Sequence, residues 1–157
     1  MLRITKLTDY AIVVLTHMAH GNDVPWTARE TALQTGLPEP SVRKILKGLA
    51  RSGVLLSERG TSGGYRLGRP AGLVTVADVI DAVEGPISIT DCSGEAVDPC
   101  EYSGSCAAEK NWTLINQRVR SALADITLLD MSAPTPALVE LGLPRTAAST
   151  PESSKAP

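Results

Sequence analysis

The chain has 157 residues, of which 43% are hydrophobic, and a formal net charge of −2. This length suits one compact domain with an appendage, and a set of aromatic residues that includes no Phe argues against a surface for stacking on single-stranded nucleic acid. Residues 1–70 contain ten Lys and Arg against five Asp and Glu, whereas residues 71–157 contain five against twelve, which predicts a nucleic-acid-binding front half joined to a module that does not bind nucleic acid.

The first predicted helix covers residues 7–20, where apolar residues recur at helical spacing. We expect Thr8 to cap its start and Gly21 to end it. His17 and His20 lie near its end, where the helix dipole favours a positive charge, so we interpret both as structural residues and not as ligands.

Two short helices with a tight turn between them come next. Thr27 and Glu30 have the spacing of a capping box that starts the earlier helix, and Pro40 suits the first position of the later one. The later helix has an apolar stripe, which we expect to be buried: Val42, Ile45, Leu46 and Leu49. Its other side is basic: Arg43, Lys44, Lys47 and Arg51. The pattern predicts a helix-turn-helix whose second helix enters the major groove of DNA, with a merely solvated basic face as the alternative.

Residues 54–59 are predicted to form a strand, which turns at residues 60–64 and returns over residues 65–67. A hairpin directly after a helix-turn-helix is typical of a wing. Its glycines allow close approach to phosphates, and Arg59 and Arg66 add positive charge. The turn is not a nucleotide-binding loop, because it lacks the strand-to-helix context and the Gly-Lys-Ser/Thr ending.

Within this head we expect different contacts from different cations. Arg43 and Lys44 are the predicted base contacts, Lys47 and Arg51 the predicted phosphate contacts, and Arg59 is placed to enter the minor groove. The complete predicted DNA-binding set is Thr27, Ser41, Arg43, Lys44, Lys47, Arg51, Arg59, Gly63, Tyr65 and Arg66.

A further helix is predicted to start at the Thr75 cap, with Asp78 at its third position, and to end at Gly85. From Asp78 through Glu109 the chain has eight acidic residues and no Lys or Arg, so this region should face away from DNA phosphates. Such surroundings also make thiolate ligation costly unless a metal centre neutralises the charge.

The three cysteines lie in one polar segment, at Cys92, Cys100 and Cys106, with the spacing C-x7-C-x5-C. Thiolates favour zinc, cuprous copper or iron–sulfur clusters, and gaps longer than those of a usual zinc knuckle favour a cluster. Three thiols leave at least one coordination position to fill. Glu109, or Asp9 from a second subunit, is the candidate for it, although both carboxylates also suit ordinary helix starts.

The apolar runs before the cysteines are too short for the core of a signal peptide, and no stretch of the chain reaches the length of a membrane span. We therefore expect a cytoplasmic protein whose thiols stay reduced and that does not contact a membrane.

A long helix is predicted from about Ala107 to Asp130. Its apolar residues alternate steps of three and four, as in a heptad seam: Trp112, Ile115, Val119, Ala122, Ile126 and Leu129. A narrow, sustained seam favours pairing between two subunits over packing on the helix's own domain, and a dimer would place two heads on two half-sites. The tail beyond it is rich in Ala, Ser, Thr and Pro, which predicts disorder.

The predicted fold class is therefore mainly α, with a winged helix-turn-helix head, a two-stranded wing, a cysteine loop and a long dimerisation helix. The expected divisions are the head at 1–84, the cysteine-rich cluster-binding loop at 85–107, the dimerisation helix at 108–131 and a largely disordered tail at 132–157.

Four features carry a resemblance to a known family: MLRITKLTDYA at residues 1–11, LPEPSVRKIL at 37–46, RGTSGGYRL at 59–67, and the three cysteines. Together they make residues 1–131 resemble the IscR/NsrR-type winged-helix iron–sulfur regulators, most closely the regulators of the SUF cluster-assembly system. The resemblance implies a homodimeric bacterial transcription factor whose cluster state sets its affinity for DNA.

The resemblance also implies that Cys92, Cys100 and Cys106 are cluster ligands. Some members use a His three residues after the last cysteine, where this chain has Glu109. Others use an aspartate from the partner's first helix, which corresponds here to Asp9. Cysteine spacing varies among members, so a 2Fe-2S and a 4Fe-4S cluster both remain open.

We therefore predict a transcriptional regulator, acting as a repressor of iron–sulfur cluster assembly genes, that senses cluster availability or oxidative stress through a bound iron–sulfur cluster. Its expected partners are double-stranded DNA and a second copy of the chain, with no small-molecule substrate. One alternative is a zinc- or thiol-redox-responsive winged-helix regulator without a cluster, and another is an iron–sulfur carrier or electron-transfer protein. An enzyme is not expected, because the sequence has no nucleophile–base constellation.

Overall fold

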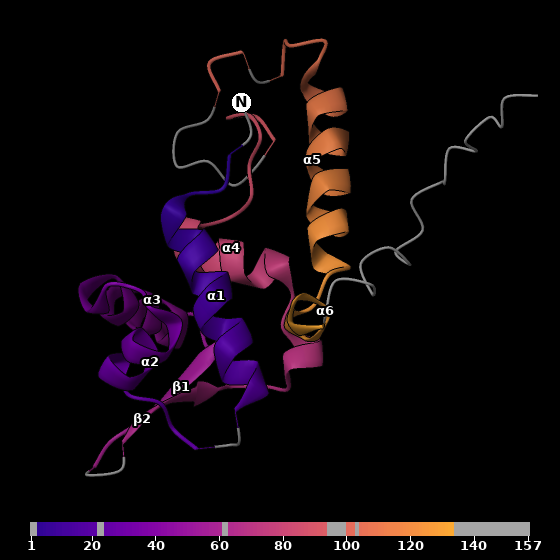
Figure 1. Cartoon of the computed structure of the whole chain (residues 1–157). Coiled ribbons are helices and arrows are strands. Elements are labelled where there is room, and N and C mark those ends of the chain that lie inside the picture. Colours follow the sequence, from indigo (N-terminus) through magenta and orange to yellow (C-terminus); the bar gives the residue numbers. More distant parts are fainter. Residues whose placement is uncertain (1–2, 22–23, 61–62, 94–99, 103, 134–157) are drawn as a thin grey trace, which may run out of the picture.

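The computed structural model of the chain describes residues 3–21, 24–60, 63–93, 100–102 and 104–133. Its elements, in chain order, are α1 (Lys6–His20), α2 (Ala28–Thr35), α3 (Glu39–Arg51), β1 (Leu55–Glu58), β2 (Gly64–Leu67), the 3-10 helix η1 (Ala71–Leu73), α4 (Val76–Glu84), α5 (Glu109–Ala124) and α6 (Leu128–Ser132). Figure 1 shows α1 to α4 and the hairpin gathered into a head, with α5 extending away from it and α6 returning to its side. The predicted fold class, mainly α with a two-stranded wing, is confirmed.

The core lies where α1, α3, α4 and α6 meet. The predicted apolar stripe of α3 is buried throughout, with Ile45, Leu46 and Leu49 at most 2% exposed. Leu15 of α1 and Leu128 of α6 pack into the same cluster. Each such side chain stabilises the fold by about 1.5–3 kcal/mol through the apolar surface that it removes from water. This shared core positions the basic side of α3 at the surface.

The start of α1 differs from the prediction. The helix begins at Lys6, and its cap is Thr5, whose side-chain oxygen accepts a hydrogen bond from the Thr8 backbone at 3.3 Å. Thr8 is buried in the first turn, where its hydroxyl donates to Glu84 of α4. Both threonines lie near the start of the predicted helix, and packing of Thr8 against α4 leaves Thr5 as the cap. Gly21 ends α1, as predicted.

The helix-turn-helix is formed as predicted. Thr27 and Glu30 make both hydrogen bonds of the capping box that starts α2, and Gly36 ends α2 in the left-handed region with φ 71°. Helix α3 begins at Glu39, so Pro40 occupies its second position and not its first. The proline still costs no intrahelical hydrogen bond there, because the first-turn amides have no partner within the helix.

The wing is an antiparallel pair in which Leu55 lies opposite Leu67 and Glu58 opposite Gly64. Residues 61 and 62 of its turn lie outside the described residues. The chain before α2 adds an unpredicted bridge, in which the Trp26 and Tyr65 backbones exchange hydrogen bonds of 2.8 and 2.9 Å. A Cβ atom on Gly64 would meet the Trp26 carbonyl oxygen at 2.7 Å, so this approach requires glycine.

The predicted single helix from Ala107 to Asp130 is wrong. Helix α5 ends at Ala124, and α6 begins at Leu128 behind a capping box made by Thr127 and Asp130. The chain between them bonds to the head, because the Ile126 carbonyl accepts a hydrogen bond from the Val76 backbone at 2.9 Å. The heptad seam therefore stops before its last two members, Ile126 and Leu129, and Leu128 joins the core instead.

Helix α4 agrees with the prediction, because Thr75 and Asp78 form its capping box and Gly85 ends it. Among the described residues no helix is long and apolar enough to cross a bilayer. The predicted disordered tail lies almost wholly outside the described residues, which end at 133.

Candidate nucleic-acid interface and cysteine segment

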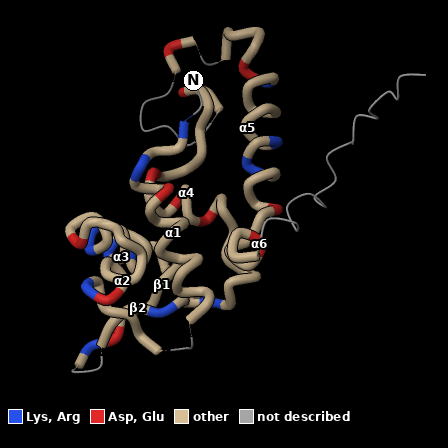
Figure 2. Tube along the Cα trace, viewed as in Figure 1, with Lys and Arg blue, Asp and Glu red and all other residues tan. Residues whose placement is uncertain are grey.

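A hollow of about 410 Å³ lies between the start of α2, the exposed side of α3 and the wing. Six of the ten predicted DNA-binding residues line it: Thr27, Arg43, Lys47, Arg59, Gly63 and Tyr65. Figure 2 shows Lys and Arg on α2, α3 and the hairpin, whereas the charged positions of α4 are acidic. The fold thus brings cations from three separate segments to one concave surface.

Arg29 also lines this hollow and was missed by the sequence prediction. It lies in the first turn of α2, two residues after the capping threonine. A cation is unfavourable there, because the positive end of the helix dipole lies at the same place. A cation at this unfavourable position was the signal in the sequence for an anion-binding role. A bound phosphate would offset the repulsion between Arg29 and the positive end of the helix dipole.

Two carboxylates also lie on this surface, and both are paired. The Arg43 Nε donates to Glu39 at 2.9 Å, one turn earlier on α3, and Arg66 pairs with Glu58 across the hairpin. Such exposed pairs are worth only about 0.3–0.5 kcal/mol. Arg43 can therefore leave Glu39 for a DNA base or phosphate at low cost.

The other predicted cations of α3 face a different side. Lys44 and Arg51, together with Lys47, line a second hollow of about 480 Å³ whose opposite wall is the end of α4, including Asp81. Of the two predicted base contacts, only Arg43 lines the wing hollow. Ser41 lines neither hollow, and Arg66 lines a separate one beside Trp26.

The three cysteines are free thiols, and each is partly exposed. The Cys92 Sγ lies 3.4 Å from the Thr90 hydroxyl, and the Cys106 backbone donates to the Tyr102 carbonyl at 3.0 Å. Within the described part of the chain, no group of three or more His, Cys, Asp or Glu side chains comes together around one point. The donor types fit a thiolate-bound centre, and among the described residues these side chains lie apart from one another.

The two candidates for a further ligand differ in their surroundings. The Glu109 carboxylate accepts a hydrogen bond from the Gly104 backbone at 2.8 Å and so holds the chain just before α5. Asp9 is exposed in the first turn of α1, next to the Thr8 that contacts Glu84. Glu109 therefore already has a structural task within its own chain.

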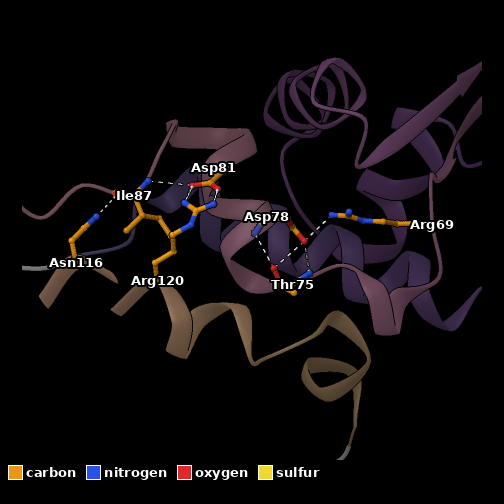
Figure 3. A network of polar contacts seen from close by, with 7 residues as sticks. All are labelled: Arg69, Thr75, Asp78, Asp81, Ile87, Asn116 and Arg120. Carbon is orange, nitrogen blue, oxygen red and sulfur yellow. Dashed lines mark hydrogen bonds and ion pairs between the residues drawn. The ribbon is translucent and has the colours of Figure 1, made fainter. Parts of the chain in front are cut away.

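A polar network that the sequence did not indicate ties the cysteine segment to α5 and α4 (Figure 3). Asn116 is the buried residue of α5, at 6% exposure, and its side chain bonds the backbone of the segment that leads to Cys92. Arg120, one turn later, forms a two-pronged ion pair with Asp81 of α4, with N–O distances of 3.0 and 2.6 Å.

The profile of the Rrf2 family, described as an iron-dependent transcriptional regulator, matches residues 4–134. The chain belongs to the Rrf2 family. It is 29% identical over 131 residues to the HTH-type transcriptional regulator IscR of Xenorhabdus nematophila, which covers 83% of this chain and 79% of that protein. IscR of Yersinia pseudotuberculosis is 28% identical over 131 residues, which again cover 83% of this chain and 79% of the relative.

Solved structures agree with this membership. CymR, the global cysteine regulator of B. subtilis, superposes with a TM-score of 0.64 at 28% identity, over 84% of this chain and 97% of CymR. The IscR of T. potens has the same fold, with a TM-score of 0.60 at 23% identity over 83% and 85% of the two chains. The chain is thus an Rrf2-family, DNA-binding transcriptional regulator and not an enzyme, as predicted.

This Rrf2 regulator also exposes apolar side chains on α5. Trp112, Leu114 and Ile115 are 38%, 53% and 43% exposed. The side of α5 that packs on its own chain is instead formed by the polar Asn116 and Arg120 with the partly buried Leu123. Leu114 and Ile115 lie on the side of α5 away from Asn116, whereas Trp112 stands one turn before Asn116 at the edge of the packed side, so α5 leaves several apolar side chains uncovered by its own chain.

Proposed function

We propose that this Rrf2 regulator is a homodimeric repressor of iron–sulfur cluster assembly genes in the cytoplasm, and that Cys92, Cys100 and Cys106 hold an iron–sulfur cluster whose state sets its affinity for operator DNA. The observation that carries the proposal is the convergence of cations on the hollow between α3 and the wing, in a chain whose free thiols lie on a segment tied to the same head by the bond from Ile87 to Asp81.

The basic hollow supports a division of labour on DNA. Arg43, near the start of α3, would contact base edges in the major groove, because the first residues of a recognition helix reach deepest. Lys47, Arg29 and Arg59 would contact phosphates on either side. The acidic α4 lies outside this surface, so repulsion favours the one orientation that the cations allow.

The exposed apolar side of α5 supports dimerisation. Trp112 and Ile115 are large apolar residues spaced three apart, and pairing with a second copy would remove them from water. Two heads joined in this way would bind two half-sites of an operator. The shortened seam, which ends with α5, still provides a contact of several turns.

For the proposed cluster, the three cysteine thiolates would be the main ligands. When bound, such a cluster supplies redox sensitivity and an electrostatic charge that neutralises nearby thiolates. Asp9 of a second copy is the preferred further ligand over Glu109, because the Glu109 carboxylate already bonds the Gly104 backbone. Both 2Fe-2S and 4Fe-4S nuclearity fit a three-thiolate set.

One observation favours a second candidate function. CymR, at 28% identity, is named a cysteine regulator, and the described residues hold no assembled metal-ligand group. A winged-helix regulator that responds through zinc or thiol chemistry, without a cluster, would fit both facts. An iron–sulfur carrier or electron-transfer protein is not supported, because the relatives are transcriptional regulators.

Anaerobic reconstitution tests the proposal. The full chain should become brown, with thiolate-to-iron absorption and iron and sulfide counts that give the nuclearity, and Cys100→Ala should lose the colour. Ser105→Ala, on an exposed residue of the same segment, is the matched control and should stay coloured. A colourless unsubstituted chain that contains zinc, or no metal, would move the function to the second candidate.

A further inference from the structure

Asp81, on α4, lies at a junction of three parts of the molecule. Its carboxylate pairs with both terminal nitrogens of Arg120 on α5. It also accepts a hydrogen bond of 3.2 Å from the Ile87 backbone, at the start of the segment that leads to the cysteines. Figure 3 shows the Arg120 guanidinium facing Asp81, with Ile87 beside them.

Asn116 holds the same segment from the other side. Its amide donates to the carbonyls of Ile87 at 3.0 Å and of Ser93 at 2.9 Å, and its side-chain oxygen accepts from the Ile89 backbone at 3.2 Å. Ser93 is the neighbour of Cys92. Because Asn116 and Arg120 are one turn apart on a rigid helix, the position of the Cys92 segment and the Asp81 pair are mechanically linked.

On its other side, Asp81 faces a hollow shared with the recognition helix. Asp81 lines the hollow of about 480 Å³ that Lys44, Lys47 and Arg51 of α3 also line. Arg120 therefore neutralises a carboxylate that shares a hollow with Lys47, the cation of α3 that also lines the wing hollow proposed to face DNA. An unpaired carboxylate at this place would attract those cations and compete with DNA phosphates for them.

We propose that Asp81, Asn116 and Arg120 are positioning residues that couple the cysteine segment to the recognition helix. With the segment docked, Asp81 is paired with Arg120, and the cations of α3 are available to DNA. Displacement of the segment pulls on Asn116 and separates Arg120 from Asp81, whose carboxylate then holds Lys44, Lys47 and Arg51 and lowers operator affinity. This coupling rests on the proposed function in one respect, which is that the cysteine segment is the part of the chain that senses the signal.

Thiol alkylation in the metal-free full chain tests the Asn116 step without any cluster. Asn116→Asp keeps an acceptor for Ile89 but loses the two donated hydrogen bonds, so Cys92 should be alkylated about tenfold faster. Asn111→Asp, on an exposed residue of the same helix, is the matched control. Cys106 in the same molecules reports general loosening, so equal Cys92-to-Cys106 rate ratios in both variants would overturn this step.

Operator affinity tests the Asp81 step by rescue. Arg120→Gln should lower the affinity about five- to tenfold at low salt, and Asp81→Asn added to it should restore the affinity to within about twofold. Asp81→Asn alone, which breaks the pair but leaves no carboxylate to hold the cations of α3, should keep full affinity, whereas a purely structural ion pair would lose affinity in both single variants. Arg118→Gln, which removes an exposed cation from the same helix, should bind as the unsubstituted chain does.

The outcomes separate the two ideas. If Arg120→Gln binds DNA normally, or the double variant does not recover, the Asp81 step is overturned while the proposed function stands. If the unsubstituted chain binds its operator equally well with and without a cluster, cluster sensing fails, whereas a successful rescue still establishes the Asp81 step. Loss of the rescue together with unchanged alkylation would overturn the whole inference.

Discussion

Glu84, the last residue of α4, accepts hydrogen bonds from the Thr8 hydroxyl and from the Thr5 backbone at 3.1 Å, so one carboxylate joins the end of α4 to the start of α1. Thr8 is 1% exposed, so its hydroxyl is largely removed from water although the Glu84 carboxylate lies at the surface. The contact also fixes the first turn of α1, where Asp9 lies exposed.

Thr8→Val should lower the free energy of unfolding by about 1–2 kcal/mol, because it removes a buried hydroxyl that donates to a charged acceptor while keeping the side-chain shape. Thr16→Val is the matched control, since the Thr16 hydroxyl bonds only backbone carbonyls of its own helix among the bonds described. Urea unfolding at one protein concentration measures both variants. Equal losses would show that the Glu84 contact adds nothing specific.

Glu84 also gives a pH dependence with a defined sign. Burial raises the pKa of Glu84, but the hydrogen bonds from Thr8 and Thr5 outweigh burial and bring the pKa below its ordinary value of 4.5. A group whose pKa is lower in the folded state contributes stability that is complete above 4.5 and is lost as the pH falls through the lowered pKa. Glu84→Gln should therefore be less stable than the unsubstituted chain near neutral pH, and the difference should shrink in acid. A difference that does not change with pH would contradict this assignment.

Two glycines should respond in opposite directions to alanine. Gly64→Ala places a Cβ 2.7 Å from the Trp26 carbonyl oxygen, a backbone atom that cannot move aside, so it should destabilise the fold by about 1–3 kcal/mol and disturb the wing. Gly48→Ala lies in the interior of α3 with nothing within 4 Å of the added carbon, and should stabilise the fold by about 0.5–1 kcal/mol. Thermal unfolding of the pair is the measurement, and a shift of the same sign in both would refute the packing argument.

Removal of cations from the wing hollow should weaken DNA binding in two distinguishable ways. Lys47→Ala and Arg29→Ala should each reduce the affinity for all sequences and lower the slope of log K against log salt by about 1, because each removes a phosphate contact. Arg43→Ala should remove about 1–3 kcal/mol of the binding free energy that discriminates the correct base from the others at one base pair, and so relax sequence specificity there. Lys110→Ala serves as the charge-matched control, because Lys110 lies in the first turn of α5, outside the wing hollow. Unchanged salt slopes would remove Arg29 and Lys47 from the interface.

Ile115→Asp tests the exposed side of α5. A charge there should convert the proposed dimer into a monomer without unfolding the head, because Ile115 is 43% exposed in the single chain. Gln117→Asp introduces the same charge on the exposed remainder of α5 and should leave the dimer intact. Light scattering after gel filtration measures the mass, and a dimer that survives Ile115→Asp would place the interface elsewhere.

The sequence by itself determined the elements whose signals are local. The α3 stripe of Val42, Ile45, Leu46 and Leu49 follows from helical period alone, and the capping boxes at Thr27 and Thr75 follow from spacings of three residues. The hairpin likewise follows from two short strands around a glycine-rich turn. These features depend on residues close together in the chain, so local spacing predicts where they form, although the α3 stripe gains its stability only from burial in the core.

Tertiary structure decided what distant residues share. Thr5 became the cap of α1 because Thr8 packs against Glu84, 76 residues away, and the helix after the cysteines broke at Thr127 because Leu128 joins the core of the head. Asn116 and Arg120 had the pattern of an ordinary helix surface until Asp81, 39 residues before Arg120, supplied the partner. Burial and long-range hydrogen bonds set these outcomes, and no local propensity encodes them.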